Sequence, residues 1–296
     1  MSRLTAPVPQ DVVGSQSDDR ENSSGRRLAG GRFHATTGTF AGGPLQSKFD
    51  DLTRWVEDAY RRELEARPSM HVYVRKLPAD VIARIDELRD SSVIVEAIRR
   101  QFPSSHVITP LKHTDELYIS HYNKDRGGDQ GLFDKHYDGN LGYIRFVSVV
   151  RALIYLQSDT SYTVVFGDSN VRQAFGTYQF GLLDFHRELH WVEGTYTPGG
   201  PQRILLKCNY LIAPANAGWA VRLVMAANTA VFYVVKAAME YSKSPRTLPQ
   251  KAVGLVCNAA RTLNNIHPLV PIVVTLFLFL AAGWGMLRVL ALLSRG

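Results

Sequence analysis

Two residues near the middle of the chain, His136 and Asp138, are of types that bind metal ions, and a single residue separates them. In an extended strand, residues i and i+2 point to the same face, so this imidazole and this carboxylate would converge. A second imidazole would complete a face of two histidines and one carboxylate, which leaves the other positions of an octahedral ion open. His190, far downstream, is the best candidate for that third ligand.

Other residues compete for these positions. His113 and Asp115 form a second His-x-Asp pair, and His186 lies four residues before His190. Zinc is the chief rival metal, because two histidines and one carboxylate also hold zinc with a water. The sequence has no His-Glu-x-x-His motif and no Cys-x-x-Cys pair, so a zinc hydrolase has little support.

The composition is that of a globular protein. The chain has 296 residues, of which 45% are hydrophobic and 21% are charged, and its formal net charge is +7. This modest basic excess indicates a solvated surface more than a nucleic-acid interface. The two cysteines, Cys208 and Cys257, imply no disulfide framework and favour a reducing compartment. The N-terminus lacks the apolar stretch of a signal peptide.

The elements that must position these ligands follow from hydrophobic periodicity. Apolar residues recur at helical spacing over residues 49–66, 78–90 and 92–101, and the run 71–77 alternates as a strand does. A strand leading into amphipathic helices is a common cover for the outer face of a β-barrel.

Between residues 107 and 214, short apolar runs are separated by clusters of Gly, Asp, Asn and Ser. Several short strands at this spacing predict a sandwich or barrel. The runs are residues 117–120, 144–150, 152–156, 162–166, 178–183 and 203–207.

The C-terminal third has a different character. Residues 217–241 are apolar but include Arg222 and Lys236, which favours an amphipathic or membrane-associated helix. Residues 268–287 carry no charge over about twenty positions, which is the length of a transmembrane helix. More basic residues precede this stretch than follow it, so we expect a single-pass C-terminal anchor with the preceding domain facing the cytosol. The sequence does not indicate which organelle membrane this anchor would enter.

The sequence therefore divides into six expected segments. They are a disordered arm (1–46), a helical and strand support region (47–106), a β domain (107–215), an amphipathic or membrane-associated helix (216–241), a basic linker (242–267) and a transmembrane helix (268–292).

Five pieces within the β domain, taken in order, resemble the Fe(II)/2-oxoglutarate-dependent dioxygenases, and within them the prolyl 4-hydroxylase-like branch. The first three pieces are a strand with Tyr122, the pair His136-x-Asp138 and the run 151–156. The fourth is the segment 181–194, which contains His190 and ends at Gly194, and the fifth is the strand 199–206 with Arg203. This order disfavours His113 and Asp115, which precede the tyrosine strand. The glycine after His190 favours it over His186.

The resemblance implies a mainly β fold, a double-stranded β-helix or jelly-roll core, flanked by N-terminal helices and followed by the C-terminal transmembrane helix. It implies that His136, Asp138 and His190 bind Fe(II), and that no further catalytic residue is needed. Arg203 is expected to bind the far carboxylate of 2-oxoglutarate, with Lys207 as the alternative on the same strand face. Tyr122 would hydrogen-bond that carboxylate. O2 is the second cosubstrate, and ascorbate is an optional reductant.

The function expected from this resemblance is hydroxylation of a side chain in a protein or peptide, by an enzyme tethered to a membrane. Two alternatives stay open. One is a nucleic-acid demethylase of the same chemistry, although no clustered basic and aromatic motif favours a nucleic-acid partner. The other is a catalytically inactive jelly-roll that serves as a membrane adaptor.

Overall fold

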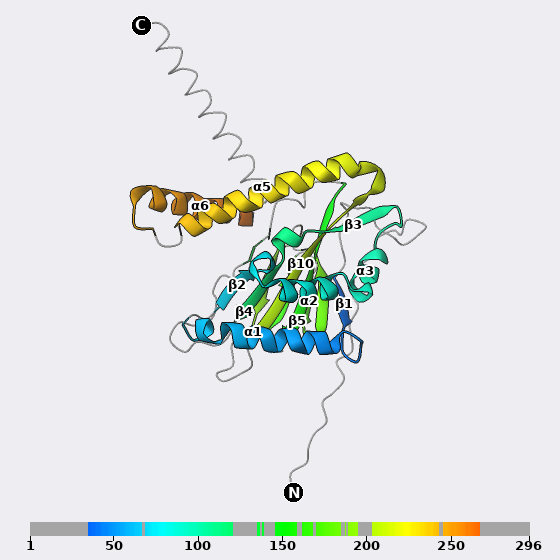
Figure 1. Cartoon of the computed structure of the whole chain (residues 1–296). Helices are drawn as coiled ribbons and strands as arrows, with labels where there is room; N and C mark the ends of the chain where they lie inside the picture. The colour runs from blue at the N-terminus through cyan, green and yellow to red at the C-terminus, as the bar shows by residue number, and fades with distance from the viewer. Residues whose placement is uncertain are drawn as a thin grey trace, which may run out of the picture.

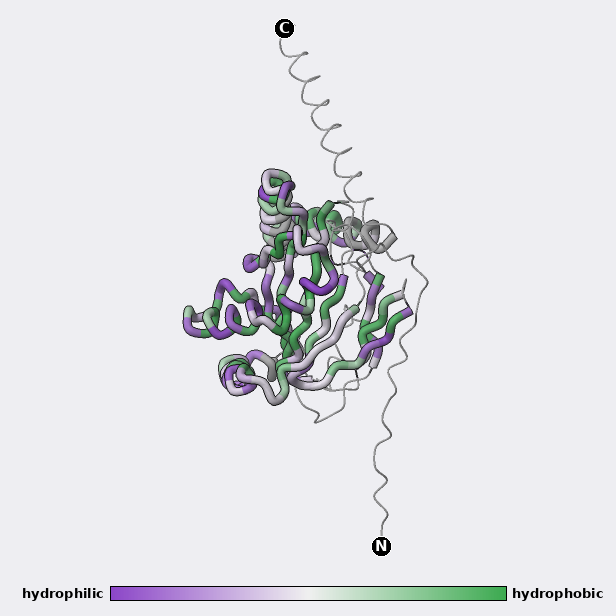
Figure 2. The backbone as a smooth tube through the Cα atoms, turned by 90° about the vertical axis from the view of Figure 1, so that its right-hand side faces the viewer, coloured by the Kyte–Doolittle hydropathy of each residue, from purple (hydrophilic) through white to green (hydrophobic). Residues whose placement is uncertain are grey.

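Two antiparallel sheets form the centre of the fold, and helices cover the outer face of the larger one (Figure 1). Figure 2 shows the strands of the smaller sheet standing beside those of the larger sheet. The computed structural model describes residues 35–66, 69–120, 135–136, 138, 146–158, 162–167, 170–184, 187, 189–194, 203–242 and 245–266.

The larger sheet has the strand order β1-β8-β5-β10-β4-β2, and β3 pairs with a further part of β10. Every pairing is antiparallel. The two longest strands, β5 and β10, lie side by side at the centre from Ile204↔Gln157 to Ile212↔Ser148. The strands are β1 (Thr36–Thr39), β2 (Ser69–Tyr73), β3 (His106–Pro110), β4 (Glu116–Ser120), β5 (Ser148–Gln157), β8 (Gln179–Leu183) and β10 (Arg203–Pro214).

The smaller sheet has the order β7-β6-β9, with β6 (Thr163–Phe166) between β7 (Val171–Ala174) and β9 (His190–Glu193). Apolar side chains from both sheets fill the space between them, among them Leu153, Val164 and Leu205. Two antiparallel sheets around a common interior fit a jelly-roll-like core, as the sequence predicts.

Alternation along β10 sorts its side chains to two sides of the sheet. Ile204, Leu206 and Cys208 belong to the core beneath the helices, whereas Leu205 packs between the two sheets. Arg203 and Lys207 share the face of Leu205 by the same period of two. The strand therefore directs two cations into the interior between the sheets.

Three helices form the outer layer: α1 (Gln46–Ala66), α2 (Ala79–Arg89) and α3 (Ser92–Arg99). Their apolar stripes pack on the outer face of the larger sheet and include fully buried Leu52, Ile85 and Ile98. The helical cover expected from periodicity is therefore present. The run 71–77 is only partly a strand, because residues Val74–Lys76 form the 3-10 helix η1.

The expectation of a disordered arm over residues 1–46 is wrong for its last part. Residues Thr36–Thr39 form β1, which pairs with β8 and becomes the edge strand of the sheet, and Phe40 is buried against Phe49 and Phe180. Gly38 permits this pairing, because a Cβ there would lie 2.4 Å from the ring of Phe180. The segment is too polar to build a core by itself, but an open sheet edge supplies its backbone with partners.

Two helices follow the β domain, α5 (Gly218–Ser242) and α6 (Leu248–Ile266). The segment 242–267, expected as a basic linker, is therefore largely helical. Val221 and Met225 of α5 pack on a small apolar cluster that contains Val149 and Leu211. The helices of the described residues include none that is both long and apolar enough to cross a membrane. The expected transmembrane helix at 268–292 lies outside the described residues.

Candidate metal centre

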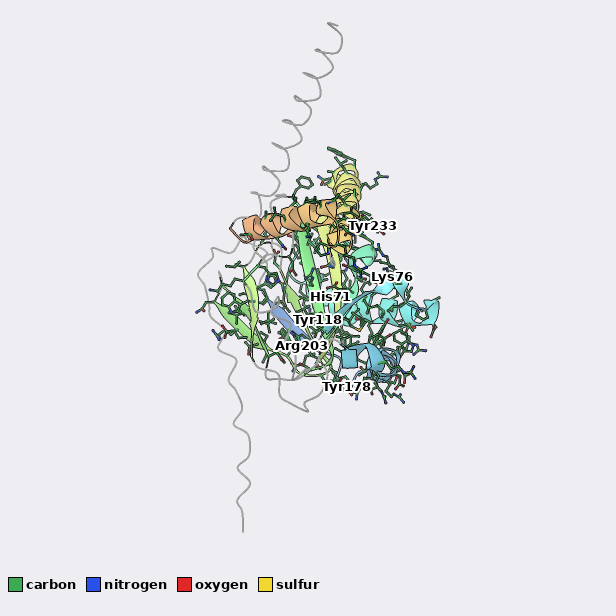
Figure 3. All side chains as sticks on the ribbon, turned by 90° about the vertical axis from the view of Figure 1, so that its left-hand side faces the viewer. His71, Lys76, Tyr118, Tyr178, Arg203 and Tyr233 are labelled. Atoms are coloured by element: carbon green, nitrogen blue, oxygen red, sulfur yellow. The ribbon has the colours of Figure 1, made fainter. Side chains whose placement is uncertain are left out.

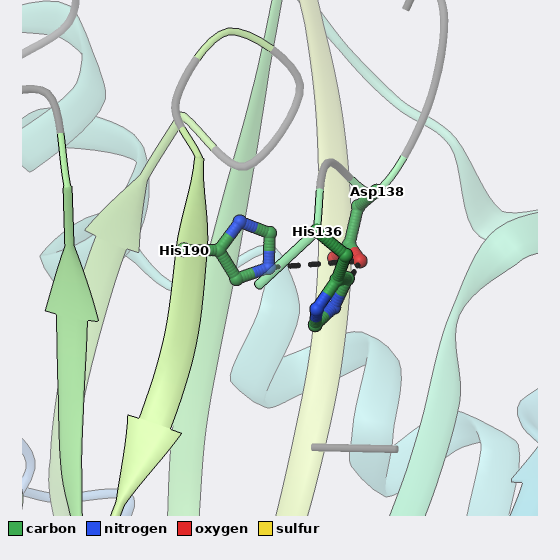
Figure 4. A group of neighbouring side chains, drawn as sticks. All are labelled: His136, Asp138 and His190. Carbon is green, nitrogen blue, oxygen red and sulfur yellow. Dashed lines mark ion pairs between the residues drawn. The ribbon is translucent and has the colours of Figure 1, made fainter. Parts of the chain in front are cut away.

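The side chains of His136, Asp138 and His190 converge between the two sheets (Figure 4). Their ligand atoms all lie within 4.8 Å of one another. Oδ1 of Asp138 lies 3.2 Å from Nε2 of His136 and 3.7 Å from Nε2 of His190. One carboxylate oxygen is thus aimed at the space between two imidazoles.

The backbone holds the two histidines opposite each other. His136 and His190 exchange two backbone hydrogen bonds of 3.0 Å, each N–H donating to the carbonyl of the other. This isolated antiparallel bridge lies on one edge of β9. On the other edge of β9, His190 pairs with Phe166 of β6. The period of two then carries Asp138 to the face of His136, as the sequence predicts.

The donor set fits a single octahedral ion. Three ligands at about 2.1 Å from one ion, at right angles to one another, would lie about 3.0 Å apart. The distances from Oδ1 of Asp138 to the two imidazole nitrogens, 3.2 and 3.7 Å, are close to that spacing. Nitrogen and oxygen donors of this kind, two imidazoles and one carboxylate on one face, suit Fe(II) and leave three positions for other ligands.

Arg151 of β5 holds the other oxygen of this carboxylate. Its guanidinium forms an ion pair with Oδ2 of Asp138, and its Nε donates a 2.9 Å hydrogen bond to Oδ1 of Asn209. Burial raises the pKa of Asp138, but Arg151 and the two histidines outweigh it and keep that pKa well below its usual range. Asp138 is therefore a carboxylate at neutral pH, with Oδ1 left for an ion.

Arg203 is buried deeper in the same interior, with 2% of its surface exposed. Its guanidinium lies 5.1 Å from the ring centroid of Tyr162 and 5.8 Å from that of Tyr155. Among the described residues, its Nε and Nη1 have no hydrogen-bond partner. A buried cation with unused donors is costly unless an anion binds it, so the geometry suits a carboxylate ligand.

The register of β5 places Arg203 relative to the three converging side chains. Tyr155, which faces Arg203, is four residues from Arg151, which is about 13 Å along a strand. The guanidinium of Arg203 beside Tyr155 and the carboxylate held by Arg151 therefore lie at two levels of the same interior.

Lys207, the alternative anchor, already has a partner. Its Nζ lies 2.9 Å from Oε1 of Glu116, which also lies 3.4 Å from Nδ1 of His71. Burial raises the pKa of Glu116, but Lys207 and His71 outweigh it and hold that pKa below its usual range. The three residues His71, Tyr118 and Arg203, labelled in Figure 3, come from the neighbouring strands β2, β4 and β10. The structure thus favours Arg203 over Lys207 as the cation with free donors.

The structure adds residues that sequence reasoning did not select. Tyr155 and Tyr162 line the guanidinium of Arg203, and Arg151 binds Asp138. The available signal was the alternation of β5, which puts Arg151 and Tyr155 on one face. Tyr122 and His186, both considered from the sequence, lie outside the described residues.

The rival pair His113-x-Asp115 has a structural role. Asp115 is buried and lies 3.0 Å from the guanidinium of buried Arg89, while Nε2 of His113 lies 3.2 Å from Oγ1 of Thr229 on α5. Burial raises the pKa of Asp115 to about 6, with Arg89 opposing this effect. The two side chains thus serve two separate contacts, and neither belongs to the group that converges at His190.

Replacing Asp115 with alanine should therefore destabilise the fold and leave metal binding intact. Removing one partner of a buried ion pair costs about 3 kcal/mol, because Arg89 would lose its most deeply buried carboxylate. Urea unfolding should show this loss as a lower free energy of unfolding. An Fe(II) titration without urea, where the variant is still folded, should give the same affinity as wild type. A weakened Fe(II) affinity in a folded variant would instead place Asp115 at the metal.

Comparison with known proteins gives a match only at the level of structure. A search against models of protein families finds no match, and a search of curated proteins also finds none.

The matched solved structures include a viral collagen prolyl hydroxylase from Paramecium Bursaria Chlorella virus-1, with TM-score 0.36 and 10% identity over 61% of this chain and 97% of that one. A prolyl hydroxylase from Trichoplax adhaerens, in complex with a hypoxia inducible factor peptide fragment, matches with TM-score 0.40 and 14% identity over 60% and 82%. HygX from Streptomyces hygroscopicus, with nickel, 2-oxoglutarate and hygromycin B bound, matches with TM-score 0.34 and 16% identity over 61% and 82%.

Two of these matches are to prolyl hydroxylases, and the third is to a protein with bound 2-oxoglutarate. All three TM-scores are below 0.5 and all three identities are 16% or less.

Proposed function

We propose that this chain is an Fe(II)- and 2-oxoglutarate-dependent dioxygenase that hydroxylates a side chain in a protein or peptide. The observation that carries the proposal is the convergence of His136, Asp138 and His190, with one carboxylate oxygen aimed between two imidazoles. The buried guanidinium of Arg203, in the same interior, supports a dicarboxylate cosubstrate. The substrate class rests on the resemblance of the sequence to prolyl 4-hydroxylases.

Each residue then has a defined task. His136, Asp138 and His190 would hold Fe(II) on one face, and Arg203 would bind the far carboxylate of 2-oxoglutarate through two parallel hydrogen bonds. Arg151 keeps Oδ2 of Asp138 occupied, so that Asp138 offers the ion one oxygen. When bound, Fe(II) with 2-oxoglutarate and O2 supplies oxidative hydroxylation of a C–H bond, and succinate and CO2 are the coproducts.

The proposal includes a membrane tether. Residues 268–287 are uncharged over about the length that a bilayer core requires, and more basic residues precede them than follow them. The dioxygenase domain would then face the cytosol. This part of the proposal rests on sequence composition.

The direct test uses the purified full chain in detergent, supplied with Fe(II), O2 and 2-oxoglutarate. We expect succinate to form even without a substrate, at a low uncoupled rate, and a chelator to stop it until Fe(II) is restored. A catalytically inactive adaptor would form no succinate and bind no Fe(II). That result would overturn the enzymatic proposal.

A further inference from the structure

The two C-terminal helices expose an unusual amount of apolar surface. Among the described residues, all but three of the exposed large apolar side chains, Val93, Val107 and Phe146, lie on α5 or α6. Those on the helices are Trp219, Leu223, Tyr233, Val234, Tyr241, Leu248, Leu255 and Val256. Exposed apolar patches concentrated in one region of a protein mark sites of contact with a partner or a membrane.

Four of the five exposed large apolar residues of α5 form one continuous stripe, and the ring centroid of the fifth, Tyr233, lies 4.5 Å from the guanidinium of Arg75. Trp219, Leu223, Val234 and Tyr241 fall within about 60° of one another around the helix, at 100° per residue. Only alanines, all exposed, occupy the intervening positions of that stripe at 226, 230 and 237. The stripe runs about 33 Å from Trp219 to Tyr241, and the opposite side of the helix, with Val221 and Met225, packs on the β domain.

Helix α6 repeats this arrangement. Its exposed apolar residues Leu248, Leu255 and Val256 recur at helical spacing, with exposed alanines at 252 and 259 between them. α6 packs against α5, and Figure 1 shows the pair lying together along one end of the β domain. We call this pair the α5–α6 hairpin.

Charge indicates what covers the hairpin. Arg222, Arg246 and Lys251 are exposed, and Arg222 and Lys251 each lie beside the apolar stripe of their own helix. Residues 218–266 contain a single acidic residue, Glu240, against six basic ones. Apolar stripes flanked by arginine and lysine, with Trp and Tyr at the ends of a helix, are typical of helices that lie in the headgroup region of an anionic bilayer.

We propose that the α5–α6 hairpin binds the surface of a lipid bilayer with anionic headgroups, with both helices lying along it. This goes beyond a tether at 268–292, because it fixes the β domain against the membrane through its own described residues. It is also independent of the dioxygenase chemistry. A bilayer is preferred to a second copy of this chain because the basic residues beside the stripes would repel their equivalents.

The test places an environment-sensitive fluorophore on the hairpin of the full chain in lipid nanodiscs, one chain per disc. Cys257→Ser removes the partly exposed thiol, and Cys208 is fully buried, which raises its pKa and protects it from labelling. Leu223→Cys or Leu255→Cys then provides one labelling site. Val93→Cys on α3 is the matched control, because it is 39% exposed and lies away from the hairpin.

We expect labels at 223 and 255 to shift to the blue and to be quenched by spin-labelled lipids, more in anionic than in neutral discs, while the label at 93 stays water-like. Arg222→Glu with Lys251→Glu should remove the anionic preference. Labels at 223 and 255 that match the control would overturn the proposal, since a chain held only by another segment gives that result. A shift that needs two chains per disc would assign the hairpin to a second copy and would also overturn it.

Discussion

Replacing His136 with alanine is expected to weaken Fe(II) binding more than about 100-fold and to abolish succinate formation. Changing residues that merely hydrogen-bond to metal ligands already costs about 10–100-fold in affinity, and here a ligand itself is lost. The fold should survive, because the His136 side chain is 25% exposed and its bridge to His190 is made by the backbone. Asp138 also keeps its ion pair with Arg151.

Anaerobic titration with Fe(II), or with Mn(II) as a redox-stable substitute, would measure this loss. His113→Ala is the matched control, because His113 belongs to the other His-x-Asp pair and contacts Thr229 on α5. We expect that variant to bind Fe(II) as wild type does. If His113→Ala loses the ion and His136→Ala retains it, the assignment of the metal centre is wrong.

Replacing Arg203 with methionine is expected to raise the KM for 2-oxoglutarate by about 30- to 1000-fold, which corresponds to about 2–4 kcal/mol for a lost buried charge pair. Fe(II) affinity measured without 2-oxoglutarate should stay unchanged, because Arg203 lies away from the three ligands along the strand. The methionine side chain fills most of the space that the arginine side chain occupies. The substitution also removes a buried cation whose Nε and Nη1 have no hydrogen-bond partner among the described residues. The apoprotein should therefore be at least as stable as wild type.

Lys207→Met is the matched control for this experiment. Lys207 is on the same strand face, but its ammonium already pairs with Glu116. Loss of the Lys207 ammonium should lower the free energy of unfolding, because Glu116 is left largely buried without its cation. The KM for 2-oxoglutarate should stay near that of wild type. The opposite pattern, with a raised KM in Lys207→Met and an unchanged one in Arg203→Met, would move the cosubstrate anchor to Lys207.

Much of the architecture could be predicted from local pattern. Periodicity located α1, α2 and α3 to within a few residues, because each buries one apolar stripe on the sheet. Short apolar runs indicated most of the central strands, although residues 148–150 and 152–156, expected in two separate runs, belong to the single strand β5. Strand β1 could not be predicted, since its pairing depends on an edge of β8 that lies over 130 residues away in the sequence.

The sequence by itself determined that His136 and Asp138 share a face, because the period of two is a local property of a strand. That spacing alone does not distinguish this pair from His113 and Asp115, and only the order of the pieces in the resembled family favoured His136 and Asp138. The physical reason for that choice lies in the tertiary structure, which places His190 beside one pair and buried Arg89 beside the other. Likewise, the free donors of Arg203 and the partner of Lys207 follow from contacts between strands, which no local pattern encodes.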